Sequence, residues 1–153
     1  MFEAIKEELP DTDILIKSAA VADYRPAVVA ENKIKKGIDD ENNPIVTDVS
    51  GMYIPLARTQ DILGWVAENH HLGLFVCGFS METENLLANS SKKLEKKKLN
   101  MIVANSLRTA GAGFGTDTNV VTLITKDGAQ ELPIMSKDDV AARILDRISE
   151  MSE

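Results

Sequence analysis

The chain contains 153 residues, of which 44% are hydrophobic and 27% are charged, so it is long enough to form one α/β domain with a buried core. Its net charge of −7 disfavours nucleic-acid binding through a broad basic face, and no apolar run reaches the roughly 20 residues that a membrane span needs. The single cysteine, Cys77, excludes an internal disulfide and a zinc site built from cysteines, so we expect a cytoplasmic protein that contacts neither nucleic acid nor membrane.

The first part of the chain predicts a helix, a buried strand and a loop. Residues 1–9 carry apolar side chains at helical spacing and are followed by Pro10. The run ILIKSAAVAD, which begins at Ile14, predicts a strand buried on both faces. Residues 37–50 predict a mobile loop, and the segments IVTDV and MYIPLA predict short strands within and after it.

The second part alternates helical and strand patterns. Thr59 is the predicted N-cap of a helix over DILGWVAENHH, and LGLFVCGF is a second buried strand. Thr83 is the predicted cap of the helix ENLLANSSKKLEKKK, and MIVAN is a third buried strand. Two apolar runs around residues 126–128 predict a hairpin, and Ser136 is the predicted cap of an amphipathic C-terminal helix.

This order of elements predicts an α/β fold, a Rossmann-like three-layer sandwich with a mostly parallel sheet and a C-terminal antiparallel hairpin. We expect a single domain over residues 1–153. Open parallel sheets bind ligands beyond the carboxyl ends of their strands. That rule selects residues 18–24, 78–83 and 104–106 as the candidate ligand edge.

Several residues at this edge are suited to a nucleotide. The small side chains of SAAVAD would let a base or ribose approach the backbone, and Asp23 could accept hydrogen bonds from ribose hydroxyls. The alternative is that SAAVAD only allows tight packing and that Asp23 is a turn residue. Phe79, near the end of a strand, could stack on a base or ribose, or could close the core.

Positive charge is concentrated in two clusters. Lys33, with its neighbours in KIKK, stands beside the predicted loop and could close over phosphates, although a solvated surface run has the same pattern. Lys93 and Lys97 are four residues apart on the predicted lysine-rich helix and thus share one face. They could bind an anion, or they could complement the helix dipole.

Other functional classes leave no signature in the sequence. There is no Walker phosphate loop, no complete GxGxxG after a strand, no HExxH and no GxSxG. The adjacent His70 and His71 at a helix end favour a dipole contact or exposure over a metal site, and we predict no protein ligand for a metal. The residues alone therefore indicate an anion-binding α/β domain.

A resemblance to a known family sharpens this interpretation. AAVADYRP at residues 19–26, followed by KIKK at 33–36, closely resembles the signature of bacterial phosphopantothenoylcysteine synthetase, the phosphopantothenate–cysteine ligase that forms the carboxy-terminal half of a bifunctional coenzyme A biosynthesis flavoprotein. Four further blocks match the family in order: Asp61-Ile62-Leu63, GFSMET at 78–83, KKLEKKKLNMIVAN at 92–105 and FGTDTNVVTLI at 114–124.

The resemblance implies a nucleotide site that uses the strand ends and lysines described above. Lys33 is the residue expected to stabilise charge during catalysis, and Asp23 and Lys33 are expected to bind the nucleotide by side chain. The remaining expected contacts are Lys17, Ser18 and Ala19, mainly through their backbone, and Gln60, Asp61, Ile62, Leu63, Phe79, Lys93 and Lys97.

The reaction that the resemblance implies is the joining of 4'-phosphopantothenate to L-cysteine. The phosphopantothenate carboxylate attacks the α-phosphate of CTP, with Mg²⁺ or Mn²⁺, to give an acyl-cytidylate, and the amine of cysteine then displaces CMP. The family implies a homodimer, and no flavin is expected because the decarboxylase half does not match this chain.

The sequence departs from the family pattern in ways that leave an alternative. Family members begin with a glycine-rich strand–turn–helix, and this sequence starts after it. Gly37 stands where a serine is common, and Gln60 replaces a common proline. A truncated, non-catalytic nucleotide-binding or dimerisation domain is therefore the second hypothesis, and the lack of a glycine-rich fingerprint argues against a third, an NAD-dependent oxidoreductase.

Overall fold

The computed structural model describes residues 1–34, 46–48, 51–82, 84–106 and 115–152. These residues form two compact units. The sheet unit consists of Met1–Ala19 and Ile62–Glu153, and the ribbon unit consists of Ala20–Asp61. Most of the predicted loop at 37–50 lies outside the described residues, and a single domain over residues 1–153 stays a prediction.

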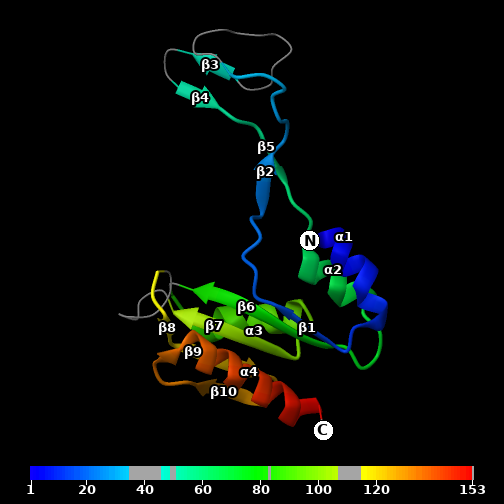
Figure 1. Ribbon diagram of the computed structural model, residues 1–153, viewed down its shortest axis with the longest axis vertical. Helices are drawn as coiled ribbons and strands as arrows, with labels where there is room; N and C mark the ends of the chain where they lie inside the picture. The colour runs from blue at the N-terminus through cyan, green and yellow to red at the C-terminus, as the bar shows by residue number, and fades with distance from the viewer. Residues whose placement is uncertain (35–45, 49–50, 83, 107–114, 153) are drawn as a thin grey trace. The chain divides into compact units, whose positions relative to one another are not determined.

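The sheet unit contains all the helices of the described residues and most of the strands (Figure 1). Its helical elements are α1 (Phe2–Glu8), η1 (Leu9–Asp11), α2 (Ile62–Asn69), α3 (Leu86–Lys96) and α4 (Lys137–Ser152). Its strands are β1 (Ile14–Lys17), β6 (Phe75–Glu82), β7 (Met101–Ser106), β8 (Thr118–Asn119), β9 (Val121–Thr125), β10 (Gly128–Glu131) and β11 (Met135–Ser136).

Five of these strands form one sheet in the order β1-β6-β7-β9-β10. β6 pairs in parallel with β1 on one side and with β7 on the other. β9 runs antiparallel to β7 and forms a hairpin with β10. The predicted mostly parallel sheet with a C-terminal antiparallel hairpin is confirmed.

Helices cover both faces of this sheet, as a three-layer fold requires (Figure 1). On one face, Leu9, Val66 and Leu94 from the elements before β7 pack against the strands, together with the partly buried Phe2 and Trp65. The rings of Phe2 and Trp65 meet edge to face with centroids 5.4 Å apart. On the other face, α4 packs through Val140, Ile144 and Ile148.

The predicted helix caps have mixed outcomes. Ser136 is the predicted cap of α4, and its hydroxyl accepts a hydrogen bond from the Asp139 backbone N–H at 3.0 Å and donates to the Asp139 carboxylate at 2.6 Å. Thr59 as the cap of α2 is wrong, because the helix begins at Ile62 and the Thr59 hydroxyl donates instead to the carbonyl of Ala22. Thr83 lies outside the described residues, and Asn85 occupies the N-cap position of α3.

The prediction that the first strand is buried on both faces is also wrong. β1 ends at Lys17 and is an edge strand of the sheet. Its Leu15 packs against the core that contains Leu9 and Val66, whereas Ile14 and Ile16 on the opposite face are 47% and 37% exposed. An apolar run in the sequence does not reveal whether its strand has a partner strand on one side or on both, so edge and central strands can have the same pattern.

The ribbon unit consists of two antiparallel strand pairs. β2 (Tyr24–Pro26) pairs with β5 (Leu56–Arg58), and β3 (Val46–Asp48) pairs with β4 (Gly51–Tyr53). The predicted short strands in IVTDV and MYIPLA are thereby confirmed. Two-stranded ribbons bury little apolar surface, and several large apolar side chains of this unit remain exposed, among them Tyr24, Val29, Tyr53 and Leu56.

No helix in the ranges that the structure describes combines the length and the apolar character required to cross a membrane.

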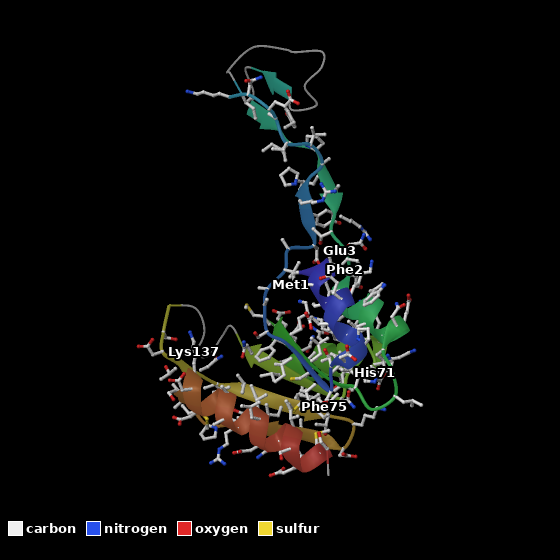
Figure 2. All side chains as sticks on the ribbon, turned by 45° about the vertical axis from the view of Figure 1, so that its right-hand side comes forward. Met1, Phe2, Glu3, His71, Phe75 and Lys137 are labelled. Atoms are coloured by element: carbon white, nitrogen blue, oxygen red, sulfur yellow. The ribbon has the colours of Figure 1, made fainter. Side chains whose placement is uncertain are left out.

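A histidine joins two loops of the sheet unit. His71 lies in the turn between α2 and β6 (Figure 2). Its Nε2 is 3.0 Å from the carbonyl oxygen of Thr12 and its Nδ1 is 3.0 Å from that of Leu72. A neutral imidazole has one N–H, whereas the imidazolium can donate to both oxygens. The Leu72 and Thr12 carbonyls, and the nearby Asp13 carboxylate, therefore raise the pKa of His71 above its usual value.

This geometry predicts a pH-dependent contribution to stability. Because the pKa is higher in the folded state, the stabilisation is fully present below the unfolded pKa of about 6.5 and is lost as pH rises through the folded pKa. We expect His71→Gln to lower the free energy of unfolding more at about pH 5.5 than at about pH 8.5, measured by urea unfolding. His70→Gln is the matched control, and an equal pH dependence in both variants would contradict the assignment.

Candidate functional site

The carboxyl ends of three parallel strands lie at one edge of the sheet. Lys17, at the end of β1, is in register with Gly78 of β6. β6 then continues to Glu82, which is in register with Ser106 at the end of β7. The side chain of Lys17 donates to the carbonyl of Ala19 at 3.0 Å, which fixes the first turn after β1. The parts of the three predicted segments that belong to the sheet unit thus lie at one edge of the sheet, and ligand binding there stays a prediction.

A buried polar contact fixes α3 against β6. The hydroxyls of Ser80 and Ser90 lie 2.7 Å apart, and the two residues are 4% and 0% exposed. Two hydroxyls that satisfy each other in an apolar layer define the register of the two elements, because a shift of either would leave a buried polar group unpaired. Asn85, just before α3, has φ 50° and ψ 40°, a left-handed conformation that asparagine tolerates better than most residues.

The last residue of β6 contacts the predicted anion-binding face of α3. The Oε1 atom of Glu82 lies 3.9 Å from the Nζ of Lys93, and its Oε2 accepts a hydrogen bond from the Asn89 side chain at 3.3 Å. Asn89 also donates to the backbone carbonyl of Glu84 at 3.0 Å. Each oxygen of the Glu82 carboxylate therefore has a partner on α3.

The two predicted lysines lie at the end of this helix. Lys93 is half-exposed, and the backbone N–H of Lys97 donates to the Lys93 carbonyl at 3.0 Å. Lys97 occupies the C-cap position, since α3 ends at Lys96. The four-residue spacing therefore places both lysines at the C-terminal end of α3, where cations also complement the helix dipole.

A side-chain amide pair closes the edge beyond β7. The Asn119 side chain of β8 donates to the Oδ1 of Asn105 at 3.1 Å, and its own Oδ1 accepts from the backbone N–H of Val120 at 2.9 Å. Asn105 lies in the predicted segment at residues 104–106, directly beside Met81 of β6 in register. This pair fixes the start of the β8–β9 segment at the carboxyl edge.

The other sheet-unit residues of the predicted site differ in what they present. Phe79 is partly buried and packs against the core under α4, while Ile62 is 4% exposed in the core on the opposite face and Leu63 packs beside it. The Ile62 side chain is therefore committed to the core, which leaves its backbone for any ligand contact. Ser18 and Ala19 are exposed in the turn after β1.

The remaining predicted residues belong to the ribbon unit. Asp23, Lys33, Gln60 and Asp61 are all exposed. The carbonyl of Asp23 accepts a hydrogen bond from the Thr59 backbone N–H at 2.9 Å, next to the β2–β5 pair. Lys35 and Lys36 of the KIKK motif lie outside the described residues. A common nucleotide pocket formed by these residues and those of the sheet unit stays a prediction.

The described part of the chain contains neither an assembled metal-binding cluster nor a reactive thiol. No cluster of three or more His, Cys, Asp or Glu side chains is placed to hold a metal ion there. Cys77 is buried in β6, and burial raises the pKa of its thiol to about 12. The thiol therefore stays protonated near neutral pH and serves as a core side chain rather than as a nucleophile.

Sequence reasoning identified the lysines of α3 and missed Glu82 and Asn89. Glu82 lies within the GFSMET block, and Asn89 precedes Lys93 by four residues, the spacing that places two side chains on one helix face. That spacing was the available signal for Asn89. Glu82 is the glutamate of that block, but its contacts could not be predicted, because its partners come from a different element.

The fold and the side chains at the sheet edge define a broad class of protein. A three-layer α/β domain with a mostly parallel sheet, whose carboxyl edge carries Lys17 and Lys93, is a Rossmann-like domain. The chain belongs to the family described as DNA/pantothenate metabolism flavoprotein C-terminal domain, whose model matches residues 1–151.

Individual relatives agree with this assignment. The coenzyme A biosynthesis bifunctional protein CoaBC of Bacillus subtilis (strain 168) is 43% identical over 154 aligned residues, which cover 100% of this chain and 35% of the relative. The chain thus spans about a third of the length of the curated relatives that it matches. The resemblance stated from the sequence motifs is confirmed.

Solved structures share the fold. The crystal structure of the C-terminal domain of a coenzyme A biosynthesis bifunctional protein CoaBC has a TM-score of 0.70 and 35% identity, and the match covers 98% of this chain and 60% of that one. A DNA/pantothenate metabolism flavoprotein from Streptococcus pneumoniae has a TM-score of 0.69 at 20% identity, with 99% of this chain and 66% of that one covered. The second likeness concerns the fold alone.

The buried serine pair makes a prediction about stability. Ser90→Ala leaves the Ser80 hydroxyl buried without its partner, so we expect it to lower the free energy of unfolding by about 1–3 kcal/mol. The double variant Ser80→Ala/Ser90→Ala removes both hydroxyls, and its loss should be smaller than the sum of the two single losses. Urea unfolding of the four proteins measures the coupling, and strictly additive losses would show that the pair does not act as a unit.

Proposed function

We propose that this chain provides the nucleotide-binding part of a CTP-dependent phosphopantothenate–cysteine ligase of coenzyme A biosynthesis. The family match over residues 1–151 carries the proposal, together with the 43% identity to a protein named for coenzyme A biosynthesis. Lys17 and Lys93 at the carboxyl edge of the sheet unit give it a physical basis, since a triphosphate requires positive charge nearby.

The proposed chemistry depends on positioning and on charge neutralisation. A carboxylate oxygen of 4'-phosphopantothenate attacks the α-phosphorus of CTP, and the bond to pyrophosphate breaks. The amine of L-cysteine then attacks the acyl carbon, loses a proton and displaces CMP. Lys33 stabilises charge in the first step, while Lys93 and Lys97 hold the phosphates. Asp23 binds the ribose, and Phe79 lies beside the nucleoside.

The remaining contacts of the proposed pocket come from short segments next to these residues. The backbone of Lys17, Ser18 and Ala19 meets the nucleotide after β1, and Gln60, Asp61, Ile62 and Leu63 meet it at the start of α2. Mg²⁺ or Mn²⁺ enters with the triphosphate, because Mg²⁺ is commonly bound through substrate phosphates and water. No flavin takes part in this ligation.

The assembly and the location follow the same proposal. We assign the chain to a cytoplasmic homodimer, and the exposed apolar side chains of the ribbon unit support a second copy as the partner. Val29 is 83% exposed and Tyr53 is 61% exposed. A two-stranded ribbon is marginally stable at best when isolated, so it needs a partner to pack against.

Ligand selectivity is the first test. Calorimetric titration of the chain with CTP, ATP and NADH in the presence of Mg²⁺ should show the tightest binding for CTP. Release of pyrophosphate on addition of 4'-phosphopantothenate would demonstrate the ligase, whereas CTP binding without release would favour a domain that binds the nucleotide without catalysis. Preference for NADH would contradict both.

Lys33 provides the second test. Lys33→Gln removes a charge that the proposal places at the reacting phosphate, so the rate of acyl-cytidylate formation by a complete ligase carrying the change should fall by about 10²–10³. Pyrophosphate release under single-turnover conditions measures this rate. Lys126→Gln, an equal charge change in the turn between β9 and β10, is the control, and an unchanged rate in Lys33→Gln would remove the residue from the mechanism.

A further inference from the structure

A carboxylate stands where the proposed site needs positive charge. Glu82 ends β6 at the carboxyl edge of the sheet, and its side chain is 18% exposed. A carboxylate near a triphosphate raises the energy of the complex through like-charge repulsion unless a cation lies with it. Its partner Lys93 is 42% exposed and can reach a ligand while it remains beside Glu82.

The carboxylate is held at both oxygens by side chains of a single helix. Asn89 and Lys93 are four residues apart on α3, and they contact Oε2 and Oε1 respectively at 3.3 Å and 3.9 Å. The buried bond between Ser80 and Ser90, at 2.7 Å, fixes α3 to β6 two residues before Glu82 and one residue after Asn89. The fold therefore fixes the backbone on both sides of these side-chain contacts and brings Asn89 and Lys93 within reach of the carboxylate.

From this arrangement we infer that Glu82 is the positioning residue for Lys93, directing its ammonium toward an anionic ligand at the carboxyl edge. The inference rests on the proposed function, because it assigns Lys93 to the nucleotide phosphates. A lysine has many rotamers, and a fixed carboxylate restricts its ammonium to a small region before the ligand arrives. The ammonium has three N–H donors, so it can bond a phosphate oxygen without leaving Glu82.

Three possible roles of Glu82 predict different effects of Glu82→Gln on the affinity for CTP. If Glu82 only repelled the ligand, Glu82→Gln would tighten CTP binding. If Glu82 only supported the fold, Glu82→Gln would lower the free energy of unfolding, and its effect on CTP would persist without Lys93. If Glu82 positions Lys93, the substitution weakens CTP binding only while Lys93 is present.

A double-mutant cycle on the full chain separates these cases. Calorimetry with CTP and Mg²⁺ is performed on the unmodified chain, Glu82→Gln, Lys93→Gln and the double variant. We expect Glu82→Gln to weaken binding about three- to tenfold and Lys93→Gln about tenfold or more. The double variant should equal Lys93→Gln. Glutamine keeps an acceptor for Asn89, so urea unfolding of Glu82→Gln should resemble that of the unmodified chain.

A matched control isolates the change in net charge. Glu150→Gln breaks the 2.9 Å ion pair with Arg147 on α4. Arg147 lines a hollow with Thr125 and Gly128, and Thr125 is in register with Met101 at the opposite end of β7. This variant should leave the affinity for CTP unchanged.

The outcomes separate the inference from the proposed function. Tighter binding by Glu82→Gln, equal losses with and without Lys93, or an equal loss in Glu150→Gln would overturn the positioning role and leave the nucleotide site in place. Failure of the unmodified chain to bind CTP would overturn the proposed function, and the inference with it.

Discussion

The pairing of β6 with a parallel neighbour on each side is the constraint on which the rest of the sheet unit depends. It brings the carboxyl ends of β1, β6 and β7 to one edge and requires helices on both faces. Gly78 at the centre of β6 shows how closely they pack, since a Cβ there would lie 2.8 Å from Leu99 Cδ1 and 3.4 Å from Leu63 Cδ1. A side chain at this position would therefore require the Leu99 side chain to shift, and that of Leu63 to move slightly.

Most of the sheet unit could be predicted because its signals are local. The apolar runs of β6 and β7, the turn of the β9–β10 hairpin and the Ser136 cap of α4 each depend on a few consecutive residues. The errors concern tertiary context. The exposure of Ile14 and Ile16 depends on what lies beside an edge strand, and the use of the Thr59 hydroxyl depends on Ala22, which is distant in sequence.

The candidate site divides in the same way. Lys93 and Lys97 are recognisable from a cluster of like charge in an acidic chain and from their helical spacing. Asp23 and Lys33 were candidates from their places at a strand end and in a lysine cluster, and the family motifs then favoured the functional reading of each over the structural one. Glu82 belongs to the matched GFSMET block, but no role could be assigned to it from the sequence, because its contacts with Asn89 and Lys93 form only when the crossover from β6 to α3 brings that helix against the strand end.

The net charge of −7 makes this local arrangement more informative than the lysines alone. In an acidic protein a lysine can be neutralised by any nearby carboxylate, and an exposed pair of this kind contributes little to stability. The Glu82–Lys93 contact differs from such a pair, because Asn89 occupies the second carboxylate oxygen and the Ser80–Ser90 bond fixes the two elements beneath it. A carboxylate with so little freedom contributes a direction to its lysine as well as a charge, and direction is what a site that must hold a phosphate in one orientation requires.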